Sequence, residues 1–384
     1  MRIAMPTDSY LPTRDGVSTA VVTTKRALED RGHDVIVIAP DPGEDKDREV
    51  DTVYFRSRRF RSYPGYFVPV FPSNKMEVFR DLDVDIIHCQ GQMTMAIRSM
   101  LVARHLRLPI VLHFHTMVTE AARYYSPIPF DWDMAERFLW RYFRSILQRA
   151  DAVIAPSESI AQELLTRAPG IRHMAVVPVG IDLGRFRADL DGHPIRKRHG
   201  IEGRKVVAHI SRLSFEKNID LVLRAMGRLD DDTVLLLVGA GPAEAMLKEL
   251  TASLGLDDRV VFTGFVSDED LPLYYACADA FVLASCFETQ GLVVIEAMAC
   301  GLPVAAIDFR ALRDTVMEGY NGFLFQDDEL SCAQAIARCL DSDEGIRKNA
   351  RKTAEGFSLE VTAERLLETY EEAIRIKNER LRES

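Results

Sequence analysis

The sequence lacks any apolar run close to the ~20 residues that a membrane-spanning helix requires. Its first residues, MRIAMPTD, carry one basic residue and lead into no apolar leader segment, so we expect a cytosolic protein without a signal peptide. The six cysteines are scattered, with no CxxC pair, and no histidine cluster has metal-ligand spacing. We therefore expect reduced, packed thiols, and neither disulfides nor a structural metal.

An excess of acidic residues gives a net charge of −10, and this excess is unevenly distributed. Up to residue 178 there are 23 Lys+Arg against 22 Asp+Glu, and beyond it 25 against 36, so the halves carry +1 and −11. The balance argues against a nucleic-acid partner and leaves the first half as the one that could face an anionic surface.

Short apolar runs alternate with segments of helical period along all 384 residues, a length that suits two domains. The expected strands are 3–5, 35–39, 86–89, 110–113, 153–156 and 176–178, then 206–210, 233–238, 260–262, 280–284, 304–306 and 323–325. Continuous apolar strands joined by helices such as 17–31 and 94–107 indicate parallel sheets covered on both faces. We predict an α/β protein of two doubly wound, Rossmann-like domains, with ligand in the crevice at the strands' carboxyl ends.

The stretch 286–301, CFETQGLVVIEAMACG, places Glu288 just before a predicted helix and Glu296 one turn inside it. A helix that is apolar nearly all round is buried, so Glu296 needs a fixed partner. The helix start offers unpaired N–H groups to an anion. Two carboxylates beside it could accept hydrogen bonds from a sugar and a ribose at the two ends of a diphosphate. The alternative is a buried helix whose two acids satisfy local backbone.

The segment ETQGLVVIEAMACG resembles the paired-Glu motif of retaining GT-B glycosyltransferases of glycosyltransferase family 4, E-x-F-G followed by V-x-E-A-x-A-x-G. Gln290 stands where Phe is commoner, a variant of the glycolipid-forming, diacylglycerol glucosyltransferase branch. The resemblance covers nearly the whole chain and implies domains at 1–178 and 179–360, with a helix at 361–384 that crosses back to the first. It implies donor contacts from this segment, with Glu288 on the sugar and Glu296 on the ribose, and from the residues between them, Thr289, Gln290, Gly291 and Leu292.

Two motifs of the first half concern the donor. Gly16 lies at a helix start after the first strand, where a glycine lets backbone approach a phosphate, although a plain turn glycine fits the spacing equally well. The resemblance implies that Gly16 contacts the donor's distal phosphate. His113 and His115 share one side of an extended segment after the fourth strand. The resemblance implies that His115 is the active-site histidine on the transferred sugar, and it leaves His113 structural.

The acceptor residues are expected shortly after this histidine. The segment HTMVTEAARYY is similar to H-T-M-Y-E-x-Y of diacylglycerol glucosyltransferases, with Glu120 one position displaced. The resemblance implies an acceptor site that includes Glu120 and Tyr124.

In the second half, Arg212 follows a strand and Lys217 opens the next helix, so two cations are aimed at one place. Such a pair suits a leaving diphosphate, on which charge builds as the glycosidic bond breaks, although a surface Arg and Lys is the simpler alternative. Gly239 belongs to a weak GxG signal, and Glu244 occupies the third-Gly position of a nicotinamide fingerprint. The resemblance implies a wall of the donor site at Gly239, with the base near two further residues, Phe265 and Val266.

Two basic, aromatic stretches, 56–67 and 137–149, could contact anionic lipid as peripheral surfaces, or could be solvated faces whose aromatics are core. The hypothesis is a retaining hexosyltransferase that moves a sugar, glucose of UDP-glucose, to a lipid hydroxyl such as that of diacylglycerol. No Asp-x-Asp ends a predicted strand, so we expect no essential metal and no cofactor beyond the donor. The alternatives are transfer to a soluble sugar or oligosaccharide, a nicotinamide-dependent oxidoreductase, and a non-catalytic nucleotide-sugar-binding regulator.

Overall fold

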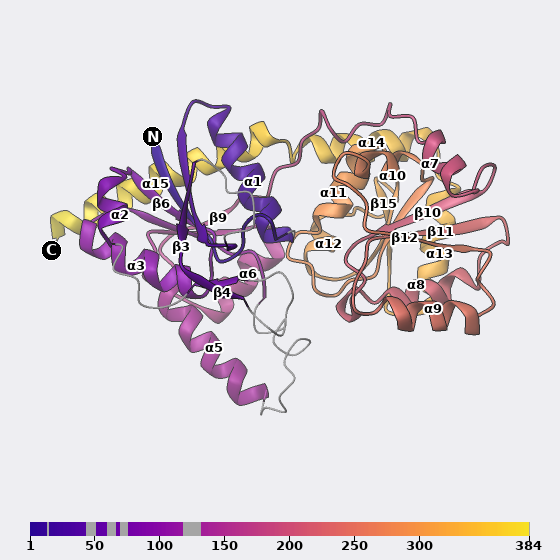
Figure 1. Ribbon diagram of the computed structural model, residues 1–384, viewed down its shortest axis with the longest axis horizontal. Coiled ribbons are helices and arrows are strands. Elements are labelled where there is room, and N and C mark those ends of the chain that lie inside the picture. The colour runs from indigo at the N-terminus through magenta and orange to yellow at the C-terminus, as the bar shows by residue number, and fades with distance from the viewer. Residues whose placement is uncertain (14, 44–50, 60–66, 70–75, 118–131, 384) are drawn as a thin grey trace. The chain divides into compact units, whose positions relative to one another are not determined.

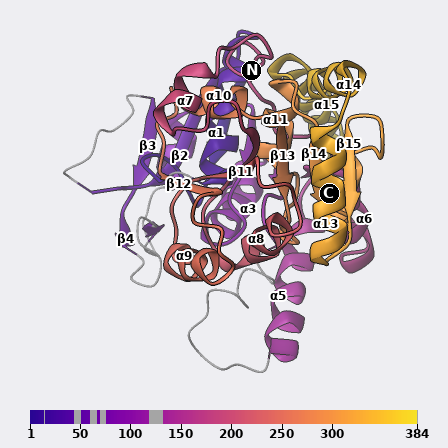
Figure 2. The same cartoon turned by 90° about the vertical axis from the view of Figure 1, so that its right-hand side faces the viewer.

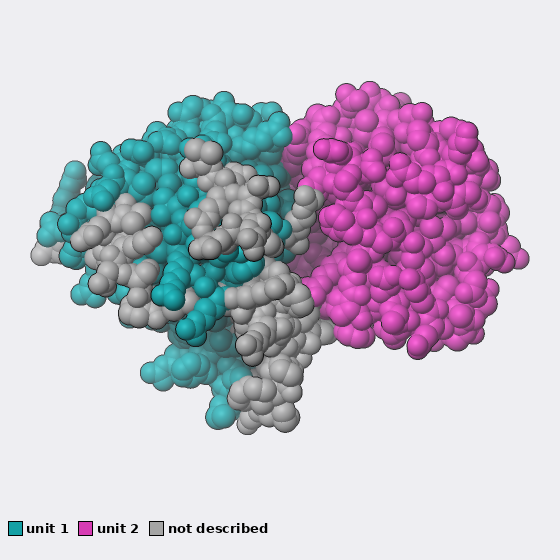
Figure 3. All heavy atoms as spheres, viewed as in Figure 1, with its two compact units in different colours: residues 1–180, 359–384 teal, residues 181–358 magenta. Residues whose placement is uncertain are grey.

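The computed structural model describes residues 1–13, 15–43, 51–59, 67–69, 76–117 and 132–383. The chain forms two compact units (Figure 3): unit 1 is Met1–Gly180 with Leu359–Ser384, and unit 2 is Ile181–Ser358. The chain thus changes unit within two residues of each boundary expected from the sequence, at 178 and 360.

Unit 1 is built on a parallel sheet of seven strands in the order β3-β2-β1-β6-β7-β8-β9. Ile3 of the central strand is in register with Val35 on one side and Ile86 on the other, so the strand order reverses beside β1. The strands are β1 (Arg2–Pro6), β2 (Asp34–Pro40), β3 (Thr52–Phe55), β6 (Ile86–Cys89), β7 (Ile110–His113), β8 (Ala152–Ala155) and β9 (Met174–Val176). Such a reversal is where open α/β sheets bind ligands.

Helices cover both faces of this sheet (Figure 1). On one face, α1 packs against the last helix, whose Leu366, Tyr370 and Ala373 join the core formed by β1 and β2. On the other face, α3 contacts α5. The helices of unit 1 are α1 (Gly16–Glu29), α2 (Met76–Asp81), α3 (Thr94–Leu106), α5 (Trp132–Leu147), α6 (Glu158–Arg167) and α15 (Leu359–Glu383).

Unit 2 repeats the architecture with six parallel strands in the order β12-β11-β10-β13-β14-β15. Helices α8, α9 and α13 lie on one face, and α10 and α11 on the other (Figures 1 and 2). The strands are β10 (Lys205–Ile210), β11 (Thr233–Val238), β12 (Val260–Gly264), β13 (Ala280–Leu283), β14 (Val304–Ile307) and β15 (Gly322–Phe325). The helices are α7 (His193–Arg198), α8 (Ile219–Met226), α9 (Glu244–Ser253), α10 (Leu271–Ala276), α11 (Leu292–Ala299), α12 (Arg310–Thr315), α13 (Glu329–Leu340) and α14 (Glu344–Glu355), with a 3-10 turn η1 (Phe215–Lys217).

The predicted strands exist in both units, and the differences have local causes. Strand β9 ends at Val176, earlier than the predicted 176–178, and Pro178 has no N–H to donate to a ladder. The edge strand β3 and the hairpin of β4 (Ser57–Arg59) and β5 (Phe67–Pro69) were not predicted, because their segments are only three or four residues long. Within the described ranges, no helix combines the length and apolar character needed to span a membrane.

Candidate active site

The loop after β10 carries the two predicted cations, and its conformation is fixed by neighbouring loops. Arg212 is partly buried two residues beyond the end of β10, and Lys217 closes η1. The buried Glu216 side chain accepts a hydrogen bond from Ser214 Oγ at 2.6 Å. Ser285 Oγ, beyond β13, donates to the Glu216 carbonyl at 3.4 Å, so the two loops at the carboxyl ends of adjacent strands are connected.

Lys217 and Glu288 form an ion pair within this region. Lys217 Nζ lies 2.5 Å from Glu288 Oε1, and the two side chains are only 19% and 15% exposed. Burial alone would raise the pKa of Glu288, but the Lys217 ammonium and the Ser285 hydroxyl together hold this pKa below its ordinary value. The expected sugar-binding acid and an expected diphosphate-binding cation are therefore in direct contact, and Glu288 is ionised.

Helix α11 begins directly after Gly291, as the sequence predicts, and it contains the carboxylate Glu296. Gly291 precedes it with φ of 79°, and a Cβ there would lie 2.7 Å from a methyl of Leu312, so a glycine is required. The Tyr275 hydroxyl, on α10, donates a hydrogen bond to Oε2 of Glu296 in α11 at 2.6 Å. Tyr275 is therefore the fixed partner that this buried acid needs. Burial raises the pKa of Glu296 to about 7, against the opposing effects of Tyr275 and Arg185. Thr289 and Gln290 lie between the ion pair and the helix start.

The glycines after β11 have a packing role. Gly239 has φ of 131°, and a Cβ there would lie 2.0 Å from the Ser211 carbonyl oxygen. Its N–H donates to Gly264 O at 3.0 Å. Beyond this contact, Phe265 is 67% exposed and Val266 packs at the edge of the unit 2 core. Packing alone thus explains Gly239, and its contact with a donor stays a prediction, as do those of Phe265 and Val266.

His209 is a residue of this region that the motif analysis missed. Its Nδ1 lies 3.0 Å from Val282 O, and its Nε2 lies 2.8 Å from Ser211 Oγ. Burial lowers the pKa of His209 to about 4, so the ring is neutral, and Lys217 and Glu288 are close enough to act on it. The available signal was a lone polar residue inside the apolar strand KVVAHI, three positions before Arg212.

In unit 1, the start of α1 is held by its own cap. Asp15 accepts from the Ser18 N–H at 2.7 Å, and Ser18 Oγ accepts from the Asp15 N–H at 2.9 Å, which is a reciprocal capping box. Ser9 Oγ also donates to the Asp15 carboxylate at 2.8 Å. Gly16 is exposed, and a Cβ there would meet no atom within 4 Å. Local packing therefore does not demand this glycine, in contrast to Gly239.

His115 ends a row of three stacked imidazoles. The rings of His113 and His115 are 4.1 Å apart between centroids, and those of His88 and His113 are 5.4 Å apart. Burial lowers the pKa of His115 to about 4, and the Asp15 carboxylate opposes this shift. Asp15 follows β1 and His115 follows β7, so both lie beyond the carboxyl ends of strands in the same parallel sheet. The Gln92 amide accepts from the backbone N–H of His115 at 2.7 Å.

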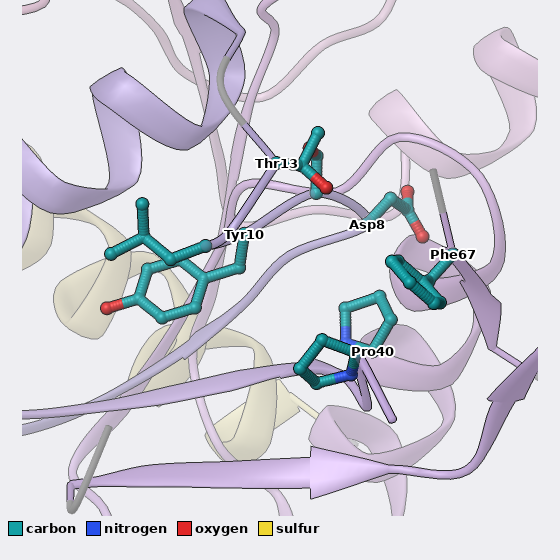
Figure 4. Close-up of a pocket in the computed structure, with 8 residues that line it drawn as sticks. Asp8, Tyr10, Thr13, Pro40 and Phe67 are labelled. Atoms are coloured by element: carbon teal, nitrogen blue, oxygen red, sulfur yellow. The ribbon is translucent and has the colours of Figure 1, made fainter. Parts of the chain in front are cut away.

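A small hollow lies beside this end of the sheet, where β1 and β2 finish (Figure 4). Asp8, Tyr10, Thr13, Pro40 and Phe67 contribute to its wall. Asp8 accepts from Met93 N at 2.8 Å and from Met95 N at 3.0 Å, and burial raises its pKa. The structure thus uses Asp8 to fix the start of α3.

The predicted acceptor and lipid-contact segments are described only in part. Glu120 and Tyr124 lie outside the described residues, as does 60–66 of the first basic stretch. In α5, Phe138 is 74% exposed, whereas Trp140 and Phe143 are buried and belong to the core. A lipid-facing role for these two buried aromatics is therefore wrong, because their rings pack against one another inside unit 1.

The candidate site residues divide between the two units, with Gly16 and His115 in unit 1 and the ion pair, Glu296 and Arg212 in unit 2. That they surround one pyrophosphate stays a prediction. Among the residues that the structure describes, no three His, Cys, Asp or Glu side chains gather as a metal site. All six cysteines are free thiols.

Two Rossmann-like units in one chain are the architecture of GT-B glycosyltransferases. The chain belongs to glycosyltransferase family 4: that family's model, "Glycosyltransferase Family 4", matches residues 14–185, and the model "Glycosyl transferases group 1" matches residues 193–356. The protein is therefore a hexosyltransferase, and the oxidoreductase alternative is set aside.

Individual relatives support the same family. The alpha-monoglucosyldiacylglycerol synthase of Streptococcus pneumoniae is 32% identical over 357 residues, which are 88% of this chain and 78% of that protein. A GDP-mannose-dependent alpha-mannosyltransferase of Mycobacterium tuberculosis is 31% identical over 383 residues, 97% and 96% of the two chains. The crystal structure of Anabaena Alr3699/HepE in complex with UDP-glucose superposes with a TM-score of 0.77 at 22% identity, over 97% of this chain and 99% of that one.

Proposed function

We propose that this glycosyltransferase retains the α configuration and transfers glucose from UDP-glucose to the hydroxyl of a lipid such as diacylglycerol, which yields an α-glycolipid. The main support is the ion pair of Lys217 and Glu288, which lies beside the start of α11. This pair joins a cation suited to a diphosphate with an acid suited to sugar hydroxyls. The S. pneumoniae relative, by its name, glucosylates such a lipid. A protein of the same fold binds UDP-glucose.

The chemistry that suits these residues is front-face substitution. The bond between the sugar carbon and the diphosphate breaks, the lipid oxygen bonds to that carbon on the same face, and the departing phosphate oxygen takes the hydroxyl proton. The protein then contributes position and charge stabilisation. Arg212 and Lys217 stabilise the diphosphate, Glu288 orients the sugar, and Glu296 binds the ribose. Unit 1 contributes the remaining contacts to the donor, from Gly16 and His115.

The proposal extends to a peripheral contact of α5 with an anionic membrane. Phe138 and Met134, one turn apart, are 74% and 61% exposed, and Arg137 and Arg141 lie exposed on the same helix. Helix α3, which contacts α5, exposes Ile97 and Leu101, and Met93, just before its first residue, is exposed as well. Cations beside exposed apolar side chains suit shallow insertion into anionic lipid.

A second candidate keeps the chemistry and changes the donor to GDP-mannose. It is favoured by the 31% identity, over nearly the whole chain, with the mycobacterial GDP-mannose-dependent enzyme. The side chains of Glu288 and Gln290 suit hydrogen bonds to the hydroxyls of either hexose. A soluble sugar acceptor remains compatible with the same site.

The test incubates the protein with radiolabelled UDP-glucose, UDP-galactose or GDP-mannose and with anionic vesicles that contain diacylglycerol. We expect label from UDP-glucose in the organic phase and an α anomer in the product. Label from GDP-mannose alone would replace the first candidate by the second, and label that stays in water with added sugars would indicate a soluble acceptor.

Variants tie the activity to the site. Arg212→Ala and Glu288→Ala should each reduce transfer at least ~100-fold, since each removes a group that acts on developing charge or on the sugar. The matched control is Arg228→Ala, which removes an exposed guanidinium of unit 2 that pairs with Glu329. Transfer within about threefold of wild type in either site variant contradicts the assignment.

A further inference from the structure

Three cations gather around one buried carboxylate where the last helix packs against the rest of unit 1. The Asp151 side chain is fully buried, and it accepts hydrogen bonds from Ile110 N at 3.0 Å and from Arg380 Nη1 on α15 at 2.5 Å. Lys377 and Arg172 are close enough for the charge of Asp151 to act on both. Three positive charges against one negative charge leave this cluster with a net charge of +2.

Lys377 occupies a core position of α15. The buried residues of this helix form one stripe, in which Leu366, Tyr370 and Ala373 belong to the core of unit 1. Lys377 continues the stripe one turn after Ala373 and is only 9% exposed. Among the residues that the structure describes, none forms a hydrogen bond or an ion pair with its ammonium group. A buried charge without a partner is unfavourable, so this position favours a ligand of opposite charge.

The two arginines of the cluster are anchored but still exposed. Arg172 Nη1 donates to Ala150 O at 2.8 Å and also to Gln148 O. Arg172 is exposed, and the side chain of Arg380 is 41% exposed. A guanidinium has five N–H donors, so each arginine keeps donors for a further partner. A small anion can therefore reach the arginines from solvent, and their charges already act on Lys377.

The cluster lies at the amino end of the unit 1 sheet. Asp151 directly precedes β8, Arg172 lies two residues before β9, and Ile110 is the first residue of β7. His115 lies beyond the opposite, carboxyl end of β7. The length of strand β7 thus separates the cluster from the candidate active site, so an anion held here is not the diphosphate of a donor bound at His115.

We propose that Arg172, Lys377 and Arg380 form a second anion site, which binds a phosphate group. Phosphate oxygens accept hydrogen bonds from guanidinium and ammonium groups, and a guanidinium can bind two of them at once. The charge of a phosphate dianion balances the net charge of the cluster. Because the ligand bridges α15 and the segment before β9, it strengthens the attachment of the last helix to unit 1. The phosphate group belongs either to a soluble compound or to an anionic lipid, and the inference does not rest on the proposed transfer reaction.

The first experiment measures thermal unfolding of the full-length protein in inorganic phosphate and in sodium chloride of equal ionic strength. The fluorescence of Trp132 and Trp140 follows unit 1, and the dependence of its midpoint on phosphate concentration gives the dissociation constant. Phosphate at about twenty times this constant should raise the midpoint by about 4 °C. In Lys377→Met the rise should be less than about 1 °C, because an apolar side chain continues the stripe without binding phosphate.

Two variants separate this site from other effects of charge. Arg375→Met removes an exposed cation of the same helix, which pairs with Glu372 and Glu379, and it should keep the phosphate-dependent rise. Arg212→Ala removes a candidate donor contact of unit 2 and should keep the rise as well, so the anion site and the proposed function can fail independently. If Lys377→Met does not fold, Lys377→Gln takes its place, since it loses the charge and stays polar.

A second experiment distinguishes the two sources of the phosphate group, by sedimentation with vesicles of phosphatidylglycerol and of neutral phosphatidylcholine. Weaker sedimentation of Lys377→Met than of Arg375→Met with the anionic vesicles assigns the site to a lipid headgroup. Equal sedimentation of the two variants, with the phosphate-dependent rise lost only in Lys377→Met, assigns it to a soluble phosphate. An equal rise in wild type and Lys377→Met overturns the proposal, as does the lack of a rise in wild type or an equal loss in Arg375→Met.

Discussion

Replacing Glu296 by Gln should stabilise unit 2, and more so at higher pH. Burial raises the pKa of Glu296 in the folded protein to about 7 from an ordinary value of 4.5. Between these two values the folded state binds more protons than the unfolded state, so stability falls as pH rises from about 4.5 to about 7 and is level above. At roughly 1.4 kcal/mol per pKa unit, the loss amounts to about 3 kcal/mol, and to about 2 kcal/mol after allowance for partial exposure.

Gln cannot ionise and still offers an oxygen to the Tyr275 hydroxyl. The free energy of unfolding of Glu296→Gln should therefore not fall over this pH range. Wild type and Glu296→Gln should be equally stable near pH 4.5 and should differ by about 2 kcal/mol at pH 8. Both tryptophans, Trp132 and Trp140, are in unit 1, so their fluorescence follows that unit alone. Calorimetry at several pH values, with fluorescence to mark the unit 1 transition, isolates unit 2. Glu249→Gln, at an exposed carboxylate of α9, serves as the control.

The raised pKa of Glu296 also predicts how donor affinity depends on pH. Ribose hydroxyls that donate to Glu296 favour its ionised form, so donor affinity should increase as pH rises through about 7. Titration calorimetry with UDP-glucose should show this rise in wild type and a flat profile in Glu296→Gln. A stability difference that does not change with pH would refute the burial argument, and a wild-type affinity independent of pH would refute the ribose contact.

Other substitutions probe the remaining parts of the site. Gly16→Ala should leave the thermal midpoint within about 2 °C, because its Cβ meets no atom, yet reduce transfer about tenfold or more if a phosphate lies there. Gly239→Ala places a Cβ 2.0 Å from a carbonyl oxygen, so urea unfolding of unit 2 should show a loss of more than ~2 kcal/mol. Lys217→Met leaves Glu288 without its cation and should cost about 3 kcal/mol by the same assay, much of which Glu288→Gln should restore without restoring transfer. Phe138→Ser should weaken sedimentation with anionic vesicles about fivefold, and unchanged sedimentation would argue against lipid contact by α5.

The sequence predicted what is encoded locally. Runs of apolar residues allowed the strands of both sheets to be predicted, because a strand buried on two faces must be apolar at successive positions. The start of α11 was predictable since Gly291 and the apolar turn after it are adjacent in sequence. The need of Glu296 for a partner was predictable for the same reason, from a charged residue inside an apolar helix.

Partners distant along the chain were not predictable. Tyr275 on α10, which satisfies Glu296, belongs to no motif, and only packing of the two helices selects it. Tyr370 and His88 are 282 positions apart and meet because α15 returns to unit 1. The amphipathic pattern of α5 showed that Phe138 and Trp140 lie on the helix, but not which of them faces the core.

The proposed function requires unit 2 to bind an anion although its residues 181–358 hold 20 Lys+Arg against 29 Asp+Glu, a net charge of −9. At physiological salt, charges separated by more than about 8 Å are largely screened, so groups in contact with the donor decide its affinity. Lys217 is such a group in the proposed function, and Glu288 already neutralises it at 2.5 Å. A diphosphate that takes Lys217 leaves a buried carboxylate in need of new donors, and the hydroxyls of the attached sugar are the nearest ones. Under the proposed function, sugar and diphosphate are therefore recognised in one exchange of partners, and the direct contact between the acid and the cation, which sequence motifs assign to different parts of the donor, fits that exchange.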